Sequence, residues 1–311
     1  MYNHEIKERF LQDVFSKTVK NSNSCYAIFD GLSVAEESSC KDVAVMSIEE
    51  VLSAIGKVNI SKYATAASAL SLIKKYVQWC AENKVFNISG KEFDEISVDH
   101  IDISESLSKL LFKDEDDFLT ALRSVRPFDD GYLEVIVMVF SWVGIELSQI
   151  FDVKIPDVDL FDRVIYLNNG LKKISFSERV GEILTVYSRT RMAKRQNGTC
   201  LRDVYRDDSY NMFIRRFCPK SQLGRELTKP QIKAAVNQMN QDYIELGNTA
   251  KFTTRNVCMS GALRRVYELE QTGVDIFSIK NKSSVIEAYR ASDKLYEILW
   301  LYRSYKRAFN L

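Results

Sequence analysis

The stretch from Val137 to Leu167 reads VMVFSWVGIELSQIFDVKIPDVDLFDRVIYL, and it decides the fold more than any other part of the chain. Its apolar first part runs into Gly144, which predicts a buried helix that ends at this glycine. A second short helix is predicted from Glu146 to Phe151, and an Asp-rich turn then leads into a strand. This order places a carboxylate directly after the end of a buried helix.

A β-hairpin is predicted next. Asn169-Gly170 separates two apolar runs, which is typical of a tight turn between antiparallel strands. The predicted strands are Val164–Leu167 and Leu171–Phe176. The rest of this part of the chain reads as helices, because its apolar residues recur at helical spacing. The predicted helices cover Glu115–Val125, Gly131–Val143, Thr228–Gly247, Thr254–Gly273 and Glu287–Phe309.

The N-terminal third is predicted to be a bundle of helices. Ser47 followed by Glu50 is a typical helix start, because each side chain can bind the other residue's backbone N–H. A longer helix is predicted within Asn59–Val85, with Ser61 as its N-terminal cap. The acidic, Ser-containing segment 89–108 is predicted to be the linker between two domains.

Charge is unevenly distributed, although the whole chain carries only +1. Residues 89–160 hold 6 basic and 17 acidic side chains, whereas residues 189–233 hold 12 basic and 4 acidic ones, a net charge of +8. Arginine outnumbers lysine in the second block, and its planar fork suits phosphate. A segregated basic block favours a nucleic-acid partner. A solvated loop face is the alternative interpretation.

Composition narrows the remaining classes. The length of 311 residues suits two domains, and 46% hydrophobic residues are typical of a folded protein. No apolar run reaches about 18 residues, so no membrane span or signal peptide is expected. The six cysteines form no C-x-x-C pair and only two histidines are present, so we expect neither a metal site nor a cofactor.

The residues around Gly144 resemble the start of the catalytic domain of tyrosine recombinases, the phage-integrase family. There the stretch reads roughly G-L-R-x-x-E-hydrophobic, and the arginine grips the phosphate that is cut. Here Glu146 stands in place of that arginine, and Gln149 in place of the glutamate. Two unit charges about 4 Å apart interact by roughly 4 kcal/mol at an effective dielectric near 20. The change therefore replaces an attraction for phosphate by a repulsion.

The family's second catalytic box, T-x-H-x-x-R-H, corresponds to FTTRNVCMSGALRRVYE from Phe252 to Glu268. Arg255 stands where the histidine would be, and Cys258 where the second arginine would be. In a shifted alignment Arg264 or Arg265 would take that place. We also hypothesise that Glu146 pairs with Arg255 and fills the vacant site.

The nucleophile of the family is a tyrosine, and Tyr289 is its nearest match here. The family's hairpin lysine corresponds to Lys172 or Lys173. No histidine follows His100, so both family histidines are absent. Loss of one well-placed electrostatic donor costs about 10²–10³ in rate, so losing several together predicts no strand transfer.

The resemblance implies an α+β fold, mainly α with a small β-sheet. A helical core-binding-like (SAM-like) domain at residues 1–100 would precede a degenerate catalytic-like domain at residues 101–311. The Y-x-x-W pattern of the family's core-binding domain is matched by Tyr76 and Trp79. The whole pattern is similar to the master lysogeny repressors of SPβ-like Bacillus phages. It implies a sequence-specific repressor of lytic genes, without recombinase activity, in the host cytoplasm at the nucleoid.

Double-stranded DNA is the expected partner, held in a clamp by both domains, with the protein a monomer in solution. A regulatory protein or peptide antagonist stays open. Two alternatives are an active recombinase with relocated residues and a protein-interaction module that uses the acidic segment. The candidate DNA contacts are Lys62, Thr65, Lys74, Lys75, Lys172, Lys173, Arg189, Arg191, Lys194, Arg195, Arg202, Arg206, Arg215, Arg216, Lys220, Arg225, Lys251, Thr253, Arg255 and Asn256.

Overall fold

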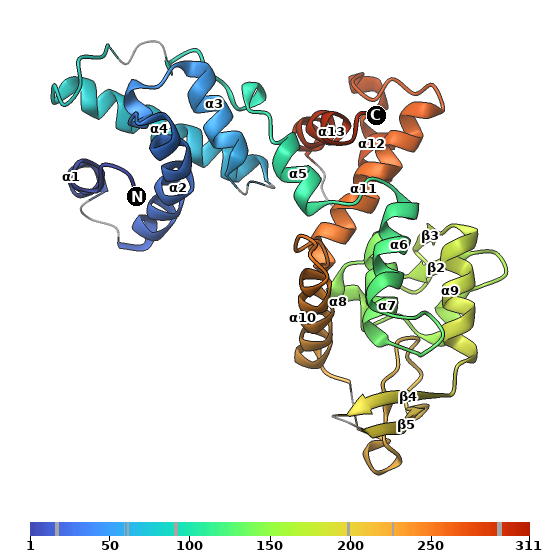
Figure 1. Cartoon of the computed structure of the whole chain (residues 1–311). Coiled ribbons are helices and arrows are strands. Elements are labelled where there is room, and N and C mark those ends of the chain that lie inside the picture. The colour runs from blue at the N-terminus through green and yellow to red at the C-terminus, as the bar shows by residue number, and fades with distance from the viewer. Residues whose placement is uncertain are drawn as a thin grey trace. The chain divides into compact units, whose positions relative to one another are not determined.

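The computed structural model describes residues 1–15, 19–58, 60, 62–89, 93–197, 200–225, 227–290 and 294–311, without the side chains of 19–22, 196, 197 and 200. The chain forms two compact units (Figure 1). Unit 1 is Met1–Ser108 with Tyr296–Leu311, and unit 2 is Lys109–Leu295. This division differs from the predicted one, 1–100 and 101–311, because unit 1 extends further and includes the last helix. The predicted fold class, mainly α with small antiparallel sheets, is confirmed.

The described residues of unit 1 form helices and connecting loops, with no strand among them. Its elements are α1 (His4–Phe15), α2 (Val19–Ser39), η1 (Val43–Val45), α3 (Ile48–Lys57), α4 (Tyr63–Glu82), η3 (Val98–His100), α5 (Ser104–Leu110) and α13 (Leu295–Phe309). The predicted capping box of α3 is present, since Ser47 Oγ accepts from Glu50 N and Glu50 Oε2 accepts from Ser47 N. Ser61 lies outside the described residues, and the N-cap of α4 is Lys62, whose side chain makes no capping hydrogen bond.

The core of unit 1 is aromatic. The Tyr76 and Trp79 rings of α4 both meet Phe10 of α1 edge to face, with centroids 5.2 and 5.8 Å apart. Their polar ends are satisfied, because Tyr76 OH donates to Asp42 and Trp79 Nε1 donates to Asp13. Buried aromatic pairs of this kind add about 0.5–1.5 kcal/mol each beyond the area they bury. The Y-x-x-W pair thus holds α1 and α4 together.

The predicted linker is wrong for most of its length. Residues 93–108 belong to unit 1, and Ile101 and Ile103 are buried there. Ser106 Oγ donates to Gly56 O, and Trp300 Nε1 of α13 donates to Val98 O. Apolar residues alternate with the acidic ones in this segment, and this explains why it is buried. The linker was predicted from the acidic composition, which does not show this alternation.

Unit 2 holds a helical core and two small sheets. Its elements are α6 (Glu115–Val125), α7 (Leu133–Trp142), α8 (Leu147–Ile150), η4 (Ile155–Asp157), β1 (Val158–Asp159), β2 (Val164–Leu167), β3 (Lys172–Ser175), α9 (Glu178–Arg189), β4 (Met192–Asn197), β5 (Cys200–Arg206), β6 (Phe217–Cys218), η5 (Lys220–Gln222), α10 (Lys229–Glu245), α11 (Thr254–Gln271), η6 (Ile279–Asn281) and α12 (Lys282–Tyr289). Within the described residues of both units, no helix is long and apolar enough to cross a membrane.

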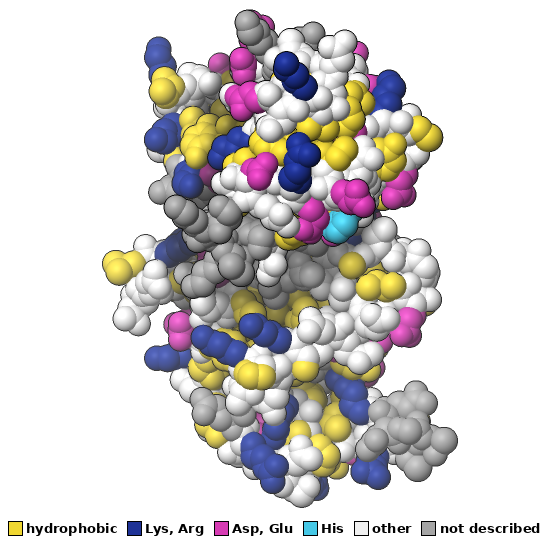
Figure 2. Space-filling model, turned by 90° about the vertical axis from the view of Figure 1, so that its left-hand side faces the viewer, with side chains coloured by type: hydrophobic (Ala, Val, Ile, Leu, Met, Phe, Trp, Pro, Cys, Tyr) yellow, Lys and Arg dark blue, Asp and Glu magenta, His cyan; other side chains and the backbone are white. Residues whose placement is uncertain are grey.

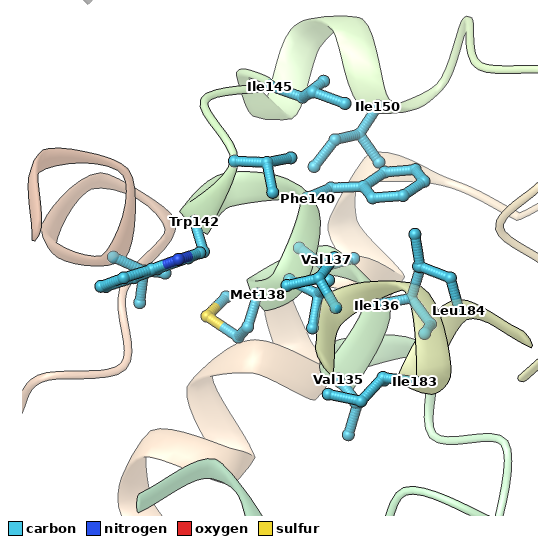
Figure 3. Close-up of a cluster of buried hydrophobic side chains, with 14 of the residues drawn as sticks. Val135, Ile136, Val137, Met138, Phe140, Trp142, Ile145, Ile150, Ile183 and Leu184 are labelled. Atoms are coloured by element: carbon cyan, nitrogen blue, oxygen red, sulfur yellow. The ribbon is translucent and has the colours of Figure 1, made fainter. Parts of the chain in front are cut away.

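Helix α7 is the centre of unit 2. Its residues from 134 to 142 are all buried, as the apolar run predicts. Figure 3 shows Ile183 and Leu184 of α9 beside the first turns of α7, and Ile150 of α8 near Phe140. Helix α11 packs on another side so closely that a Cβ added at Gly261 would lie 2.0 Å from Trp142 O. A glycine is therefore required where the two helices meet.

The predicted hairpin at Asn169-Gly170 is confirmed. Strands β2 and β3 pair antiparallel, with Leu167 opposite Lys172, and residues 168–170 all have positive φ. Strand β1 completes this sheet. A second sheet, β4-β5-β6, was not predicted, although Asn197-Gly198 is the same kind of hairpin signal. The density of basic residues there favoured a loop instead.

The predicted helix from Glu287 to Phe309 is wrong. Helix α12 ends at Tyr289, and Arg290 takes the left-handed conformation with φ of +64°. Helix α13 then starts anew at Leu295 and packs in unit 1. The apolar spacing continues through both helices, so periodicity alone did not reveal the break.

Candidate nucleic-acid interface

The end of helix α7 positions the residue at 146. Gly144 N donates to Ser141 O and Ile145 N donates to Phe140 O, so the last carbonyls of α7 are capped. Gly144 has φ of +96°, which favours glycine. The chain then turns outward, and Glu146 is exposed as the N-cap of α8. An exposed carboxylate at this point repels phosphate.

Cys258 lies on α11 within electrostatic reach of Glu146. Burial raises the pKa of the Cys258 thiol, the positive charges of Arg265 and Lys172 oppose this, and the Glu146 carboxylate adds to it. The structure therefore brings together Glu146 at the start of α8, Lys172 on β3, and Cys258 and Arg265, both on α11. The predicted ion pair between Glu146 and Arg255 is not formed, and the Glu146 carboxylate instead accepts a hydrogen bond from Ser148 Oγ at 3.5 Å.

Two arginines near this point are turned into the protein. Arg265 Nη1 donates to Trp142 O at 2.7 Å, and its Nε donates to Ala288 O at 2.9 Å. Arg290 Nη1 donates to Val143 O at 2.8 Å. Both guanidinium groups therefore sit at the C-terminus of α7, where the helix dipole favours a cation. Burial lowers the pKa of Arg265, and the neighbouring charge of Arg290 lowers it further.

Tyr289, the nearest match in the sequence to the family's tyrosine, has a buried side chain. Its side chain is only 5% exposed, on the last turn of α12. Its carbonyl accepts a 3.5 Å hydrogen bond from Arg265 Nη2. A cavity of about 520 Å³ lies next to these arginines, but Asp114, Glu115, Asp116 and Glu268 line it together with Arg264, Arg265 and Arg290. This mixed charge does not make a phosphate pocket.

The N-terminus of α11 keeps one exposed cation. Thr253 caps the helix, with its hydroxyl accepting from Asn256 N at 3.0 Å. Arg255 is exposed, whereas Asn256 is buried and donates to Ala250 O. Lys251 is half-buried with Nζ 5.3 Å from the Phe112 ring, and burial lowers its pKa. Of these four candidates, Arg255 is the one placed to reach an external phosphate.

The basic block of residues 189–233 divides into two groups. The inward group makes contacts inside unit 2. Arg206 pairs with Asp208 at 2.7 Å, and Arg215 pairs with the same carboxylate. Arg195 donates to Asp130 O and stacks 3.6 Å from the Tyr132 ring centroid, while Arg216 donates to Gln222 O.

The outward group surrounds the β4–β5 hairpin and the loop after it. Its members are exposed: Arg189, Arg191, Lys194, Arg202, Lys220 and Arg225. Figure 2 shows dark blue side chains gathered on the lowest part of this face, which belongs to β4, β5 and the following loop, with few Asp or Glu among them. A basic antiparallel ribbon of this kind suits a phosphate backbone.

Lys172 and Lys173 begin strand β3 beside the turn, opposite Leu167 and Tyr166. Lys173 is exposed and Lys172 is half-buried, so the register gives them different environments. Lys172 is the one whose charge acts on Cys258. Of the two lysines that the sequence offered, Lys172 is therefore the one that lies near Cys258 and Glu146.

The candidates of unit 1 lie on α4. Lys62, Thr65 and Lys75 are exposed, whereas Lys74 is half-buried and donates to Asp94 O at 3.0 Å. The Lys75 ammonium lies 5.8 Å from the Phe15 ring. Residues that sequence reasoning missed are Arg290 in unit 2 and Lys229, which begins α10. A cation in the first turn after Thr228 was visible in the sequence, but Arg290 was assigned to a continuous helix.

Comparison with known proteins gives two results. Residues 1–82 match the family model described as MrpR, N-terminal core-binding domain. Among solved structures, the chain is similar to the XerA recombinase, with 13% identity, a TM-score of 0.41 and coverage of 99% of this chain and 97% of that one. It is also similar to the Tn1549 transposon integrase in complex with circular intermediate DNA, with 13% identity, a TM-score of 0.40 and coverage of 96% and 94%. No curated protein matches the sequence.

Proposed function

We propose that this protein is a sequence-specific double-stranded DNA-binding repressor that silences phage lytic genes and does not cut or join DNA. One observation carries the proposal, a contrast inside unit 2. Exposed cations surround the β4–β5 hairpin, while the arginines beside Glu146 are bound to backbone carbonyls. The match of residues 1–82 to the MrpR core-binding domain supports a DNA-binding role for unit 1 as well.

The binding half of the proposal rests on electrostatics. Each phosphate that a lysine or arginine neutralises releases counterions, so the affinity falls as salt rises. With six to ten such contacts, the affinity falls about 10³–10⁵-fold between 50 and 200 mM salt. The exposed members of the candidate set, from Lys62 of unit 1 to Arg225 of unit 2, supply cations of the required number.

The non-catalytic half rests on the site at Glu146. Pentacoordinate phosphorus needs fixed cationic donors and an accessible nucleophile. Here Glu146 and Cys258 occupy the two arginine positions, and Arg265 is committed to Trp142 O and Ala288 O. Tyr289 is buried, and the sequence has no histidine after position 100. These features support binding without strand transfer.

The test is to mix the protein with fragmented phage and host genomic DNA and to sequence what it retains. Half of the sample is washed with detergent, which removes proteins that are not covalently linked. We expect many discrete sites that share one motif upstream of genes, all lost in detergent. One site at an integration junction that survives detergent would show an active recombinase instead. A uniform background would contradict sequence-specific binding.

A charge-reversal variant separates the third interpretation, a protein-interaction module. We expect Arg191→Glu with Arg202→Glu to abolish retention of the motif sites. Asp129→Lys with Asp130→Lys, which changes the acidic segment by the same amount of charge, should retain them. The opposite pattern would mean that the acidic segment carries the function. Sedimentation of the unmodified protein would check the proposed monomeric state.

A further inference from the structure

A second cavity in unit 2, which shares no lining residue with the cavity beside Arg265, has the features of a ligand site. It has a volume of about 590 Å³ and lies between α8, the chain segment 207–216 and the start of α10. This size is within the usual range for small-molecule sites. Its apolar lining includes the buried residues Ile150, Ile214 and Ile232. An apolar group can therefore be enclosed here.

The polar lining of this cavity is mainly cationic. Arg215, Arg216, Arg225 and Lys229 line it, against the carboxylates of Asp152 and Asp207. The Asp207 carboxylate is already occupied, because it accepts from Ser209 N at 3.2 Å and Gly224 N at 2.8 Å. Arg215 pairs with Asp208.

The three remaining cations form no ion pair among the described residues, although the positive charge of Arg216 contributes to the lowered pKa of Asp207. Arg216 uses one Nη2 contact to Gln222 O, Arg225 is exposed, and the Lys229 ammonium lies 5.6 Å from the Phe151 ring. Among the described lining residues, four cations stand against two carboxylates, which leaves an excess of positive charge. An anion is the complementary ligand.

An unsatisfied donor points to the same place. Arg216 Nε is buried and has no hydrogen-bond partner, and it is the one such side-chain atom in the part of the chain that the structure describes. Buried donors are nearly always paired, so a lone exception calls for an unfilled partner. Its location on a cavity-lining guanidinium makes a bound anion the simplest partner. This observation is independent of the cavity's size and charge.

We propose that this cavity binds a small amphipathic anion, an apolar group joined to a carboxylate, sulfonate or phosphate, and that its occupancy weakens DNA binding. The apolar part packs against the isoleucines, and the acid group is held by Arg216 with Arg225 or Lys229. The regulatory part rests on the proposed function, because Arg225, which lines the cavity, is one of the exposed candidate DNA contacts. A cation that holds the ligand is no longer available to bind a DNA phosphate. By thermodynamic linkage, bound DNA weakens ligand binding by the same factor.

The binding test uses a matched pair of probes. The first is 1-anilinonaphthalene-8-sulfonate, an apolar ring system with one sulfonate, and the second is N-phenyl-1-naphthylamine, the same rings without the charge. We expect the sulfonate to bind roughly tenfold to a hundredfold more tightly, which is the worth of charge-assisted hydrogen bonds. Equal binding of the two probes, measured by their fluorescence, would overturn the anion site.

Variants locate the bound probe. Arg216→Gln should remove most of the difference between the two probes. Ser148→Trp, at the exposed rim, should block both probes while keeping every cation of the lining. Arg179→Gln, an equal loss of charge on α9 away from the cavity, should change neither. If Ser148→Trp leaves sulfonate binding intact, the probe sits elsewhere and the proposal fails.

The regulatory part is tested on the motif DNA recovered from the genomic experiment. Saturating sulfonate probe should weaken DNA binding at least about fivefold, and the neutral probe should not. Unchanged DNA affinity with the cavity occupied would overturn the coupling and leave the proposed repressor intact. Failure to bind any DNA would instead overturn the proposed function, whereas the fluorescence result would still decide whether the cavity binds an anion.

Discussion

Two sets of arginines in unit 2 differ in what their side chains reach. Arg265 and Arg290 lie behind the end of α7 and donate to backbone carbonyls of Trp142 and Val143. Arg191 and Arg202, on the β4–β5 hairpin, are exposed to solvent. The same residue type therefore closes a helix end in one place and presents charge in the other. An arginine's role follows from what surrounds it, and a count of arginines does not reveal it.

The two sets also differ in their surroundings. At Glu146 an exposed carboxylate begins α8, and the guanidinium groups of Arg265 and Arg290 join the end of α7 to α11 and α12. The hairpin, by contrast, contributes little to the core and can carry charge at low structural cost.

The largest expected effect comes from breaking the inward set. Arg265→Met leaves the carbonyls of Trp142 and Ala288 without a donor, and we expect about 3 kcal/mol less free energy of unfolding. Urea unfolding followed by circular dichroism measures this. Arg264→Met is the matched control, because Arg264 lies next to it on α11 with an exposed Glu268 partner. The control should cost less than about 0.5 kcal/mol, and equal losses would remove the distinction.

Breaking the outward set should act on DNA instead. Changing Arg191, Lys194 and Arg202 together to Gln removes three exposed cations, and we expect roughly a hundredfold weaker binding near 150 mM salt. The slope of log affinity against log salt should fall by about 3. Fluorescence anisotropy with the motif DNA measures both quantities.

A matched triple change tests whether position or total charge matters. Arg163, Arg179 and Lys280 are exposed cations of unit 2 outside the hairpin, and their change to Gln should weaken binding less than about threefold. If the two triple variants lose the same affinity, the hairpin has no special role.

A cation placed at position 146 tests the same comparison at the end of α7. Glu146→Arg replaces a repulsion by an attraction, and we expect about tenfold tighter DNA binding without any covalent adduct. Glu146→Gln should give an intermediate gain. Gel analysis of suicide substrates with a nick would detect an adduct. Its appearance would mean that the remaining residues still support strand transfer.

The smallest effect concerns Asp208, the carboxylate that holds Arg206 and Arg215 inward. Burial acts to raise its pKa, but hydrogen bonds from the two arginines outweigh it and the pKa is lowered. A depressed pKa stabilises the fold above the ordinary aspartate range near 3.9, and this stability is lost as pH falls through the folded pKa.

Asp208 is half exposed, so the contribution should stay below about 1 kcal/mol. Asp208→Asn should lower the free energy of unfolding at pH 7 and have no effect once the pH lies below the folded pKa. Urea titrations at several pH values measure this. A constant difference across the range would mean that hydrogen-bond geometry, and not charge, is responsible.

Much of the fold followed from local sequence signals. The cap at Ser47, the glycine at 144 and the Asn169-Gly170 turn each act through nearby backbone, so their consequences were readable in the sequence. The break at Arg290 was not, because a non-glycine residue in the left-handed conformation is held there by tertiary contacts such as that to Val143 O. Local propensity carries no information about a contact with a distant carbonyl.

The candidate site was less readable. Charge composition located the basic block, but it did not separate Arg195 and Arg216, which face inward, from Arg191 and Arg202. Arg195 and Arg202 are opposite each other in the β4–β5 register and share one face of the sheet, so the separation comes from the tertiary contacts of Arg195 with Asp130 O and the Tyr132 ring. The predicted pair between Glu146 and Arg255 failed for a similar reason, since spacing in the sequence does not fix distances between helices.

Unit 1 is assembled from two separate parts of the chain, because it includes helix α13. The helices α1 to α5 are synthesised before unit 2, but Tyr63 packs against the rings of Tyr296 and Trp300, which follow unit 2 in the sequence. Residues 109–295 emerge in between and fold as their own unit. Unit 1 is therefore completed only after unit 2 has been synthesised. A chain that stops after residue 295 keeps the β4–β5 hairpin but lacks the part of the unit 1 core that α13 supplies.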